Sequence, residues 1–167
     1  GTALEPVLPV KLDLPDQLVV PEAAIVFVLD NSGSMNRSVF GSSRSQQQIA
    51  NESAALAVQT LDKKDLVSVI AFNSTPRVVV PLTENDDPER ISGAILGIGS
   101  GGGTNIGPAL LRAREQLQGV DAKIKHVIVL TDGRSHNAGE LPGIAASMLE
   151  GARCCRSSAA LPMPGPA

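Results

Sequence analysis

The chain has 167 residues, of which 43% are hydrophobic and 19% charged, and its formal net charge is −3. These values are ordinary for one globular domain with a sizeable core. Because no cluster of Lys and Arg stands out, nucleic-acid binding is not expected. No apolar stretch reaches the roughly 20 residues of a membrane span. Cys154 and Cys155 are adjacent, which predicts two unpaired thiols rather than a disulfide framework.

The sequence divides into three predicted parts. Residues 1–22 contain four prolines among apolar residues, a pattern that predicts an extended lead-in or edge segment. Residues 23–152 alternate between strand-like and helix-like patterns and are predicted to form one domain. Residues 153–167 show neither period and predict an irregular tail.

The first predicted strand is the continuous apolar run 25–29, which is typical of a central parallel strand covered on both faces. A polar stretch follows, and then a helix is predicted from about residue 46 to residue 61. Small and apolar residues recur along it at roughly helical spacing. The predicted inward face consists of Ile49, Ser53, Leu56, Ala57 and Thr60.

A hairpin and one further helix follow. Residues 67–72 and 77–82 are predicted as its strands, joined by turn residues. A capping Asp87 before Pro88 begins the next helix. The members of its predicted buried face are Ile91, Ile95 and Ile98.

A glycine-rich loop at 99–103 leads into a predicted helix at 106–118, then a strand at 126–130 and a last helix at 140–152. Alternating strands and helices predict an α/β fold with a mostly parallel sheet. The segment from Asp62 to Asp65 is interpreted as a solvated connection between a helix and a strand.

The run from Asp30 to Ser34 carries the most chemical information. Asp30, Ser32 and Ser34 directly follow the first apolar strand, and residues spaced by two share one side of an extended backbone. One carboxylate and two hydroxyls are hard oxygen donors, which suit Mg²⁺, Mn²⁺ or Ca²⁺ better than zinc or copper.

Two more oxygen-bearing residues are expected at the same edge of the sheet. Asp132 ends the strand at 126–130, and the glycine-rich loop delivers Thr104; in such sheets ligands lie beyond the carboxyl ends of the strands. Two neighbouring carboxylates repel each other unless a cation lies between them. The predicted metal ligands are Asp30, Ser32, Ser34, Thr104 and Asp132.

These residues resemble the metal-ion-dependent adhesion site of the von Willebrand factor type A domain family. The three motifs read Asp30-x-Ser32-x-Ser34, Thr104 within Gly-Gly-Gly-Thr-Asn, and Asp132 within Thr-Asp-Gly. The resemblance covers roughly residues 22–152 and implies a Rossmann-like, doubly wound sheet with helices on both faces. It is closest in character to bacterial members, often portions of larger membrane-anchored or multidomain proteins.

The resemblance implies a non-enzymatic, protein-binding module. In this family the two serines and the threonine bind Mg²⁺ or Mn²⁺ directly, the aspartates often act through water, and an acidic residue of a partner completes the coordination. Neither catalytic nor other cofactor-binding residues are expected. The sequence leaves the compartment, the partner and the resident ion open.

One departure from the family concerns the C-terminal part. Family members continue after the helix near residue 150 with two more strands and a helix, which this sequence is expected to lack. The strand at 126–130 would then lie at an edge of the sheet, where an apolar strand favours association.

Other interpretations of these residues agree less well with the sequence. Asp30 to Ser34 alone could be a polar turn, and the glycine pattern at 97–102 follows a predicted helix, which disfavours a dinucleotide site. A Mg²⁺-dependent phosphatase or phosphotransferase with Asp30 as nucleophile is the alternative function. Such enzymes generally need a second carboxylate two residues later, and Ser32 stands there.

Overall fold

A computed structural model describes residues 23–133, 139 and 141–148. The predicted lead-in at 1–22 and tail at 153–167 lie outside the described residues, so the predicted domain boundaries stay predictions. Within the described ranges, none of the helices has the length and hydropathy needed to cross a membrane.

Strands and helices alternate as the sequence predicts, and the predicted α/β class is confirmed. The elements are β1 (Ala23–Asp30), the 3-10 helix η2 (Gly33–Asn36), α1 (Gln46–Thr60), β2 (Leu66–Phe72), β3 (Pro76–Glu84), α2 (Pro88–Leu96), α3 (Ile106–Leu117) and β4 (Ile124–Leu130). Residues 141–148 are also helical.

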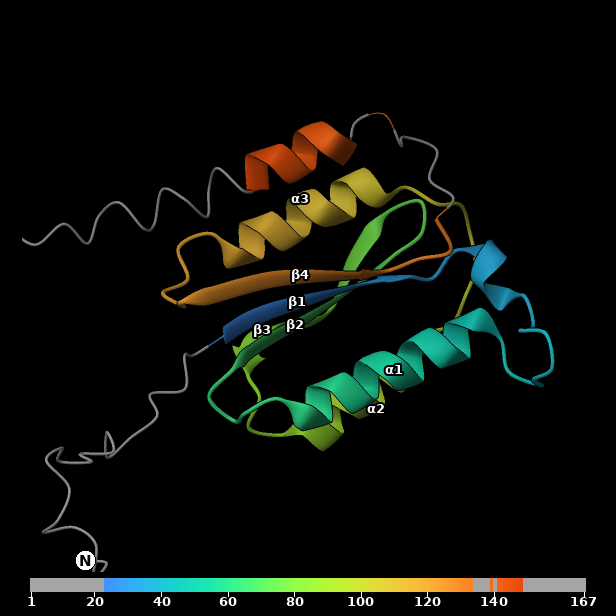
Figure 1. The fold of residues 1–167 in the computed structure, drawn as a ribbon, viewed down its shortest axis with the longest axis horizontal. Coiled ribbons are helices and arrows are strands. Elements are labelled where there is room, and N and C mark those ends of the chain that lie inside the picture. Colours follow the sequence, from blue (N-terminus) through green and yellow to red (C-terminus); the bar gives the residue numbers. More distant parts are fainter. Residues whose placement is uncertain (1–22, 134–138, 140, 149–167) are drawn as a thin grey trace, which may run out of the picture.

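The described strands form one sheet in the order β3-β2-β1-β4. β1 runs parallel to both β2 and β4, whereas β3 pairs antiparallel with β2 as the predicted hairpin partner. α3 covers one face, and α1 and α2 cover the other (Figure 1). β1 is therefore central, which explains why its apolar run is continuous rather than alternating.

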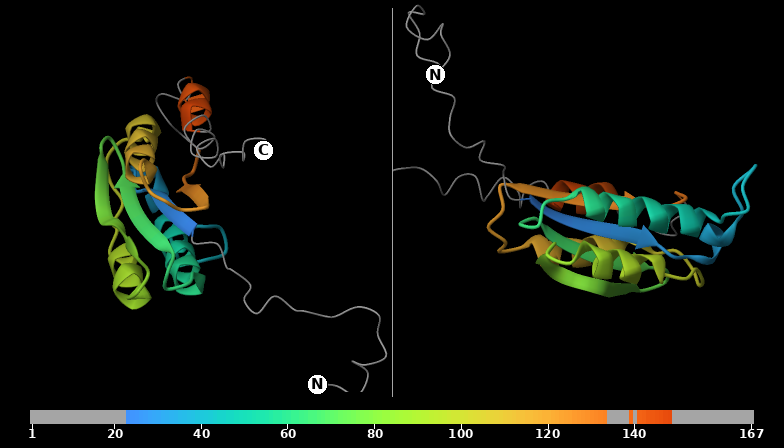
Figure 2. Two further views of the ribbon diagram at one scale, coloured as in Figure 1. Left: turned by 90° about the vertical axis from the view of Figure 1, so that its left-hand side faces the viewer. Right: turned by 90° about the horizontal axis from the view of Figure 1, so that it is seen from below.

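Alternate residues of β1 belong to two separate cores. Phe27 and its neighbours on one side pack with α1 and α2, whereas Val26 and Val28 pack with α3. All three side chains are buried. The layered arrangement is seen end-on in the left panel of Figure 2, and it places β1 between two helical layers.

The predicted inward face of α1 is wrong. Ile49 and Leu56 are 37% and 63% exposed, and the helix instead buries a face of small and amide side chains. Its buried residues are Gln47, Ala50, Asn51, Ala54, Ala55 and Val58. Close packing against α2 favours alanine there, and the two amides hydrogen-bond each other while Asn51 also bonds to the Ile98 carbonyl, so apolar periodicity alone misplaced the face.

The predictions for α2 are confirmed. Asp87 caps the helix by accepting a hydrogen bond from the Arg90 amide at 3.0 Å, and Pro88 occupies its first position. The three predicted isoleucines, Ile91, Ile95 and Ile98, are buried. The capping chemistry of this helix is local, which is why the sequence was sufficient to locate its beginning.

Asp65 is a correction to the predicted solvated connection. Its side chain is 7% exposed; its Oδ1 accepts from the Ala23 amide and its Oδ2 from the Asp62 amide, both at 3.0 Å. This carboxylate ties the beginning of β1 to the turn before β2, at the end of the sheet opposite to the predicted metal site.

Candidate functional site

The candidate site lies where β1 and β4 end. The register pairs Leu29 with Leu130 and Asp30 with Phe72, so the carboxyl ends of three parallel strands coincide. Figure 1 shows η2 directly beyond this end of the sheet. The topology thus brings together the segments that carry the first and third predicted motifs.

Asp30 provides a fully buried carboxylate at this end. It has no exposed surface, and its Oδ1 accepts a hydrogen bond from the Ser32 amide at 2.8 Å. Its Oδ2 accepts a 2.6 Å hydrogen bond from the Thr131 hydroxyl. Hydrogen bonds to both oxygens compensate a charge that would otherwise be costly to bury.

The hydroxyls of Ser32 and Ser34 converge beside that carboxylate. Their Oγ atoms lie 3.0 Å apart, and Ser32 is 1% exposed whereas Ser34 is partly exposed. Ser32 precedes η2 in an extended conformation, and its side chain makes no capping hydrogen bond. Both hydroxyls are therefore held close together at the boundary between the core and the surface.

The glycine-rich loop is fastened to the same segment by backbone contacts. The Gly33 amide donates to the Gly102 carbonyl at 3.0 Å, and the Gly101 amide donates to the Asn31 carbonyl at 2.7 Å. The side-chain amide of Asn31 donates to the Gly99 carbonyl at 3.0 Å. Three contacts thus fix this loop, which ends in Thr104, against the first motif.

The turn after β2 supports the loop from its other side. Asn73 donates through its side-chain amide to the Gly101 carbonyl at 3.0 Å and accepts from the Asn105 amide at its carbonyl at 2.7 Å. The Gly103 amide donates to the Ser74 hydroxyl at 3.2 Å. Thr104, between these anchors, is 8% exposed.

Asp132 follows β4 next to the hydrogen-bonded Thr131 and is partly exposed. The Thr131 hydroxyl accepts from the Gly133 amide at 3.2 Å while donating to Asp30. The structure thus links Asp30, Ser32 and Ser34 by direct hydrogen bonds. It fastens the loop of Thr104 to the same segment and connects the Asp132 segment through its neighbour.

The donor set is chemically suited to a hard divalent ion. Two carboxylates and three hydroxyls offer only oxygen, as Mg²⁺ and Ca²⁺ prefer, and the close hydroxyl pair shows oxygens already gathered at one point. Among the described residues no group of three or more His, Cys, Asp and Glu side chains could hold a metal. A site rich in hydroxyls has no such acidic cluster.

Sequence reasoning missed the residues that support this arrangement. Thr131, Asn31 and Asn73 each bind or orient part of the site. Thr131 directly precedes Asp132, so its place in the third motif was a usable signal. The asparagines had no such signal, because their partners are backbone carbonyls at least 28 residues away.

Comparison with known proteins agrees with this architecture. Residues 25–134 match the von Willebrand factor type A domain. The chain is 31% identical over 115 residues to an uncharacterized protein of Synechocystis, covering 68% of this chain. It is 32% identical over 127 residues to vitrin of Mus musculus, covering 74% of this chain.

A solved structure, the von Willebrand factor type A protein of Catenulispora acidiphila, superimposes with a TM-score of 0.63 at 29% identity, covering 78% of this chain and 30% of that one. The chain spans only 26% of the Synechocystis protein and 19% of vitrin. The family match over residues 25–134 nevertheless includes all three predicted motifs and most of the described sheet. The chain belongs to the von Willebrand factor type A domain family.

Proposed function

We propose that this domain is a divalent-cation-dependent protein-binding module. Asp30, Ser32, Ser34, Thr104 and Asp132 would hold Mg²⁺, or alternatively Mn²⁺ or Ca²⁺, as a metal-ion-dependent adhesion site. A Glu or Asp of a partner protein would supply the remaining ligand. The observation that carries the proposal is the buried Asp30 carboxylate beside two hydroxyls whose oxygens are 3.0 Å apart.

The bound ion would supply positive charge that attracts a partner's carboxylate. The chain's own residues would keep the ligands in place before the ion arrives. Thr131 and the Ser32 amide orient the Asp30 carboxylate, and the Gly33–Gly102 contact holds the two loops together. Such prior ordering lowers the entropic cost of binding.

A binding role is favoured over phosphoryl transfer by the surroundings of Asp30. A nucleophilic carboxylate must reach its substrate, whereas this carboxylate is fully buried and both of its oxygens accept hydrogen bonds. The position two residues later, where such enzymes generally have a carboxylate as acid or base, is Ser32. These features support a residue that organises an ion site.

The proposal is tested by melting the chain across a Mg²⁺ titration and in EDTA. A ligand that binds only the folded state stabilises it by about 2.7 kcal/mol at one hundred times its Kd. The melting temperature should therefore rise steadily with Mg²⁺. Ser32→Ala should lose most of that rise, because the hydroxyl that it removes is a proposed ligand and also hydrogen-bonds to the Ser34 hydroxyl.

Ser43→Ala is the matched control, since Ser43 is exposed in the segment before α1 and is not among the proposed ligands. It should retain the full Mg²⁺ response. A wild-type melting temperature that is the same in Mg²⁺, Mn²⁺, Ca²⁺ and EDTA would refute the ion site.

A further inference from the structure

Phe40 is exposed although the chain contains few aromatic residues. The sequence contains three phenylalanines and no Trp or Tyr. Phe27 and Phe72 are buried at 2% and 0% exposure, whereas Phe40 is 106% exposed. A fully solvated phenyl ring loses the hydrophobic stabilisation that burial provides, so the fold itself gains nothing from this side chain.

Phe40 lies in a hydrogen-bonded backbone turn. The Ser42 amide donates to the Val39 carbonyl at 3.0 Å, and Gly41 between them has φ of 79°. Positive φ at the third position is typical of a type II turn. A bridge between Ser38 and Ser45 closes the base, so Phe40 occupies the tip of a small hairpin, residues 37–45, here termed the Phe40 hairpin.

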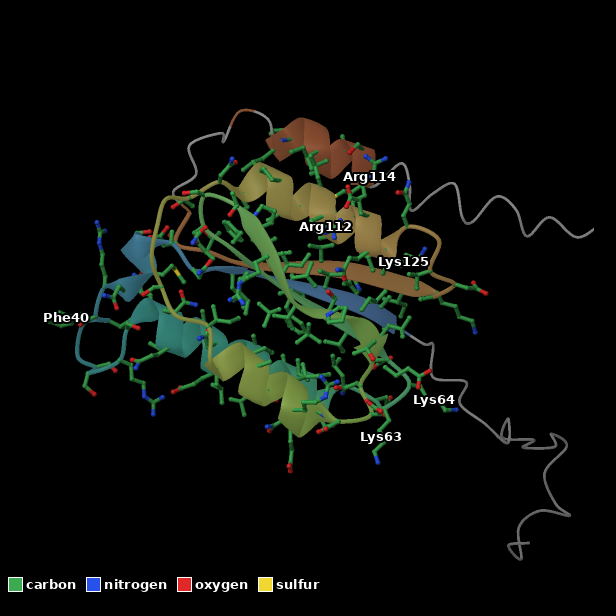
Figure 3. All side chains as sticks on the ribbon, turned by 180° about the vertical axis from the view of Figure 1, so that it is seen from behind. Phe40, Lys63, Lys64, Arg112, Arg114 and Lys125 are labelled. Atoms are coloured by element: carbon green, nitrogen blue, oxygen red, sulfur yellow. The ribbon has the colours of Figure 1, made fainter. Side chains whose placement is uncertain are left out.

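This hairpin is directly attached to the candidate metal site. The Arg37 amide donates to the Ser34 carbonyl at 3.2 Å, and the Gln46 amide, at the beginning of α1, donates to the Arg37 carbonyl at 3.0 Å. Figure 3 shows Phe40 beyond the beginning of α1, pointing away from the body of the molecule. The right panel of Figure 2 shows the same loop extending past the end of the sheet.

The charged residues of the hairpin itself are both basic, which suits an acidic partner. Between Asp30 and Glu52 the only charged residues are Arg37 and Arg44. Arg44 forms an exposed ion pair with Glu52, whereas Arg37 makes no ion pair with any residue that the structure describes. The hairpin's own charges are thus positive, although Asp132 lines the hollow that the hairpin borders.

A protein surface fits this combination better than a membrane does. Attachment to a bilayer needs a broad apolar face or several basic residues, and the hairpin offers one aromatic ring and one arginine without an ion pair among the described residues. Aromatic side chains are, by contrast, enriched among the few residues that anchor protein interfaces.

We infer that Phe40 is an apolar anchor that inserts into a hollow on the same acidic protein partner whose carboxylate is recognised at the ion site. This inference rests on the proposed function and adds a second recognition element to it. The partner would present an acidic residue and, at a fixed separation from it, an apolar hollow or a large apolar side chain.

The test uses a synthetic library of short peptides, each with one central Glu and one Leu or Trp moved through the other positions. A matched set has Gln in place of Glu. Binding of the full chain is measured in Mg²⁺ and in EDTA. The wild type should prefer apolar residues at particular separations from Glu, and Phe40→Ser should bind those peptides roughly tenfold more weakly or worse.

Leu111→Ser is the control, because Leu111 is 44% exposed on α3 and is not part of the Phe40 hairpin. It should bind like the wild type, and Phe40→Ser should keep the wild-type melting response to Mg²⁺. Mg²⁺-dependent stabilisation with no peptide binding, or with the same preferences in Phe40→Ser, overturns the anchor but not the ion site.

Three other results also separate the possibilities. A wild-type melting temperature that does not change with Mg²⁺ would overturn the proposed function itself. Phe40-dependent binding to phosphatidylserine vesicles without peptide selectivity would overturn a protein partner in favour of a membrane. Phe40-dependent dimers in sedimentation, again without peptide selectivity, would identify a second copy of the chain as the occupant.

Discussion

The Asp30 carboxylate illustrates how single atoms determine this site. It ends a strand in which every neighbouring side chain is apolar, yet it has no exposed surface. A backbone amide two residues later and a hydroxyl 101 residues later compensate its charge. The first contact follows from the local turn, whereas the second requires β4 to lie beside β1.

Thr131→Val is expected to destabilise the domain by roughly 1.5–3 kcal/mol, the usual contribution of a hydrogen bond to a charged group. The substitution keeps the side chain's shape and removes only the hydroxyl donor. Urea denaturation monitored by circular dichroism measures the change in free energy of unfolding.

Thr131→Ser retains the donor and serves as the control, with at most a small loss of stability. Equal destabilisation by Val and Ser would show that the methyl group matters more than the hydrogen bond. Absence of any effect in Thr131→Val would contradict the role assigned to the hydroxyl.

The glycine-rich loop works as one element, since it is hydrogen-bonded to the segments that follow two different strands, β1 and β2. Gly102 lies at the centre of these contacts with φ of 87°. A Cβ there would meet the Asn73 side chain at 3.2 Å. Its carbonyl accepts the Gly33 amide, so any shift of this residue would move the loop relative to the first motif.

Gly102→Ala is expected to cost about 1–2 kcal/mol from the left-handed backbone alone, and also to weaken the proposed Mg²⁺ binding by displacing Thr104. Gly101→Ala is the matched control, because a Cβ at that position has no neighbour within 4 Å and its φ is not positive. Urea denaturation in EDTA measures the first effect, and a Mg²⁺ melting titration measures the second.

Similar stability and Mg²⁺ response in the two glycine variants would contradict the importance of Gly102. Destabilisation of Gly102→Ala with an unchanged Mg²⁺ affinity would separate the backbone strain from the ion site and limit this glycine to a structural role.

At the level of the domain, β4 forms one edge of the described sheet, with β1 as its paired neighbour. Ile128 on this strand is 39% exposed. An apolar edge strand offers backbone groups and apolar surface for association with another chain, as the sequence predicted for this segment.

Ile128→Lys is expected to reduce self-association of the chain at high concentration, because charged residues on edge strands oppose pairing. Analytical ultracentrifugation over a concentration series measures the effect. Leu96→Lys, which places the same charge at a residue 54% exposed on α2, is the control. Equal self-association in wild type and Ile128→Lys would argue against an edge-mediated contact.

The strand-end motifs could be recognised without coordinates. An apolar run followed by Asp30-x-Ser32-x-Ser34 is a local pattern, and period-two geometry brings the two hydroxyls together. The Asp87 cap and the hairpin of β2 and β3 could also be predicted from the sequence, because they too depend on local patterns. The role of these oxygens in holding an ion stays a prediction, which the Mg²⁺ titration tests.

Other features depended on neighbours that local patterns do not reveal. The exposed Ile49 and Leu56 on α1 show that packing against α2 selected a face of small and amide residues. The local sequence predicts a solvated turn at Asp65, whereas the folded chain buries this carboxylate and hydrogen-bonds it to the Ala23 amide.

The amino-acid sequence by itself determined the order of strands and helices, the central position of β1 and the oxygen-bearing residues at the strand ends, because each depends on periodicity or on turns within a few residues. Tertiary packing alone established which hydroxyl bonds Asp30, how asparagines hold the glycine-rich loop, and that Phe40 remains in solvent. Those outcomes depend on atoms from distant segments meeting at hydrogen-bonding distance, or failing to meet, and no local pattern contains that information.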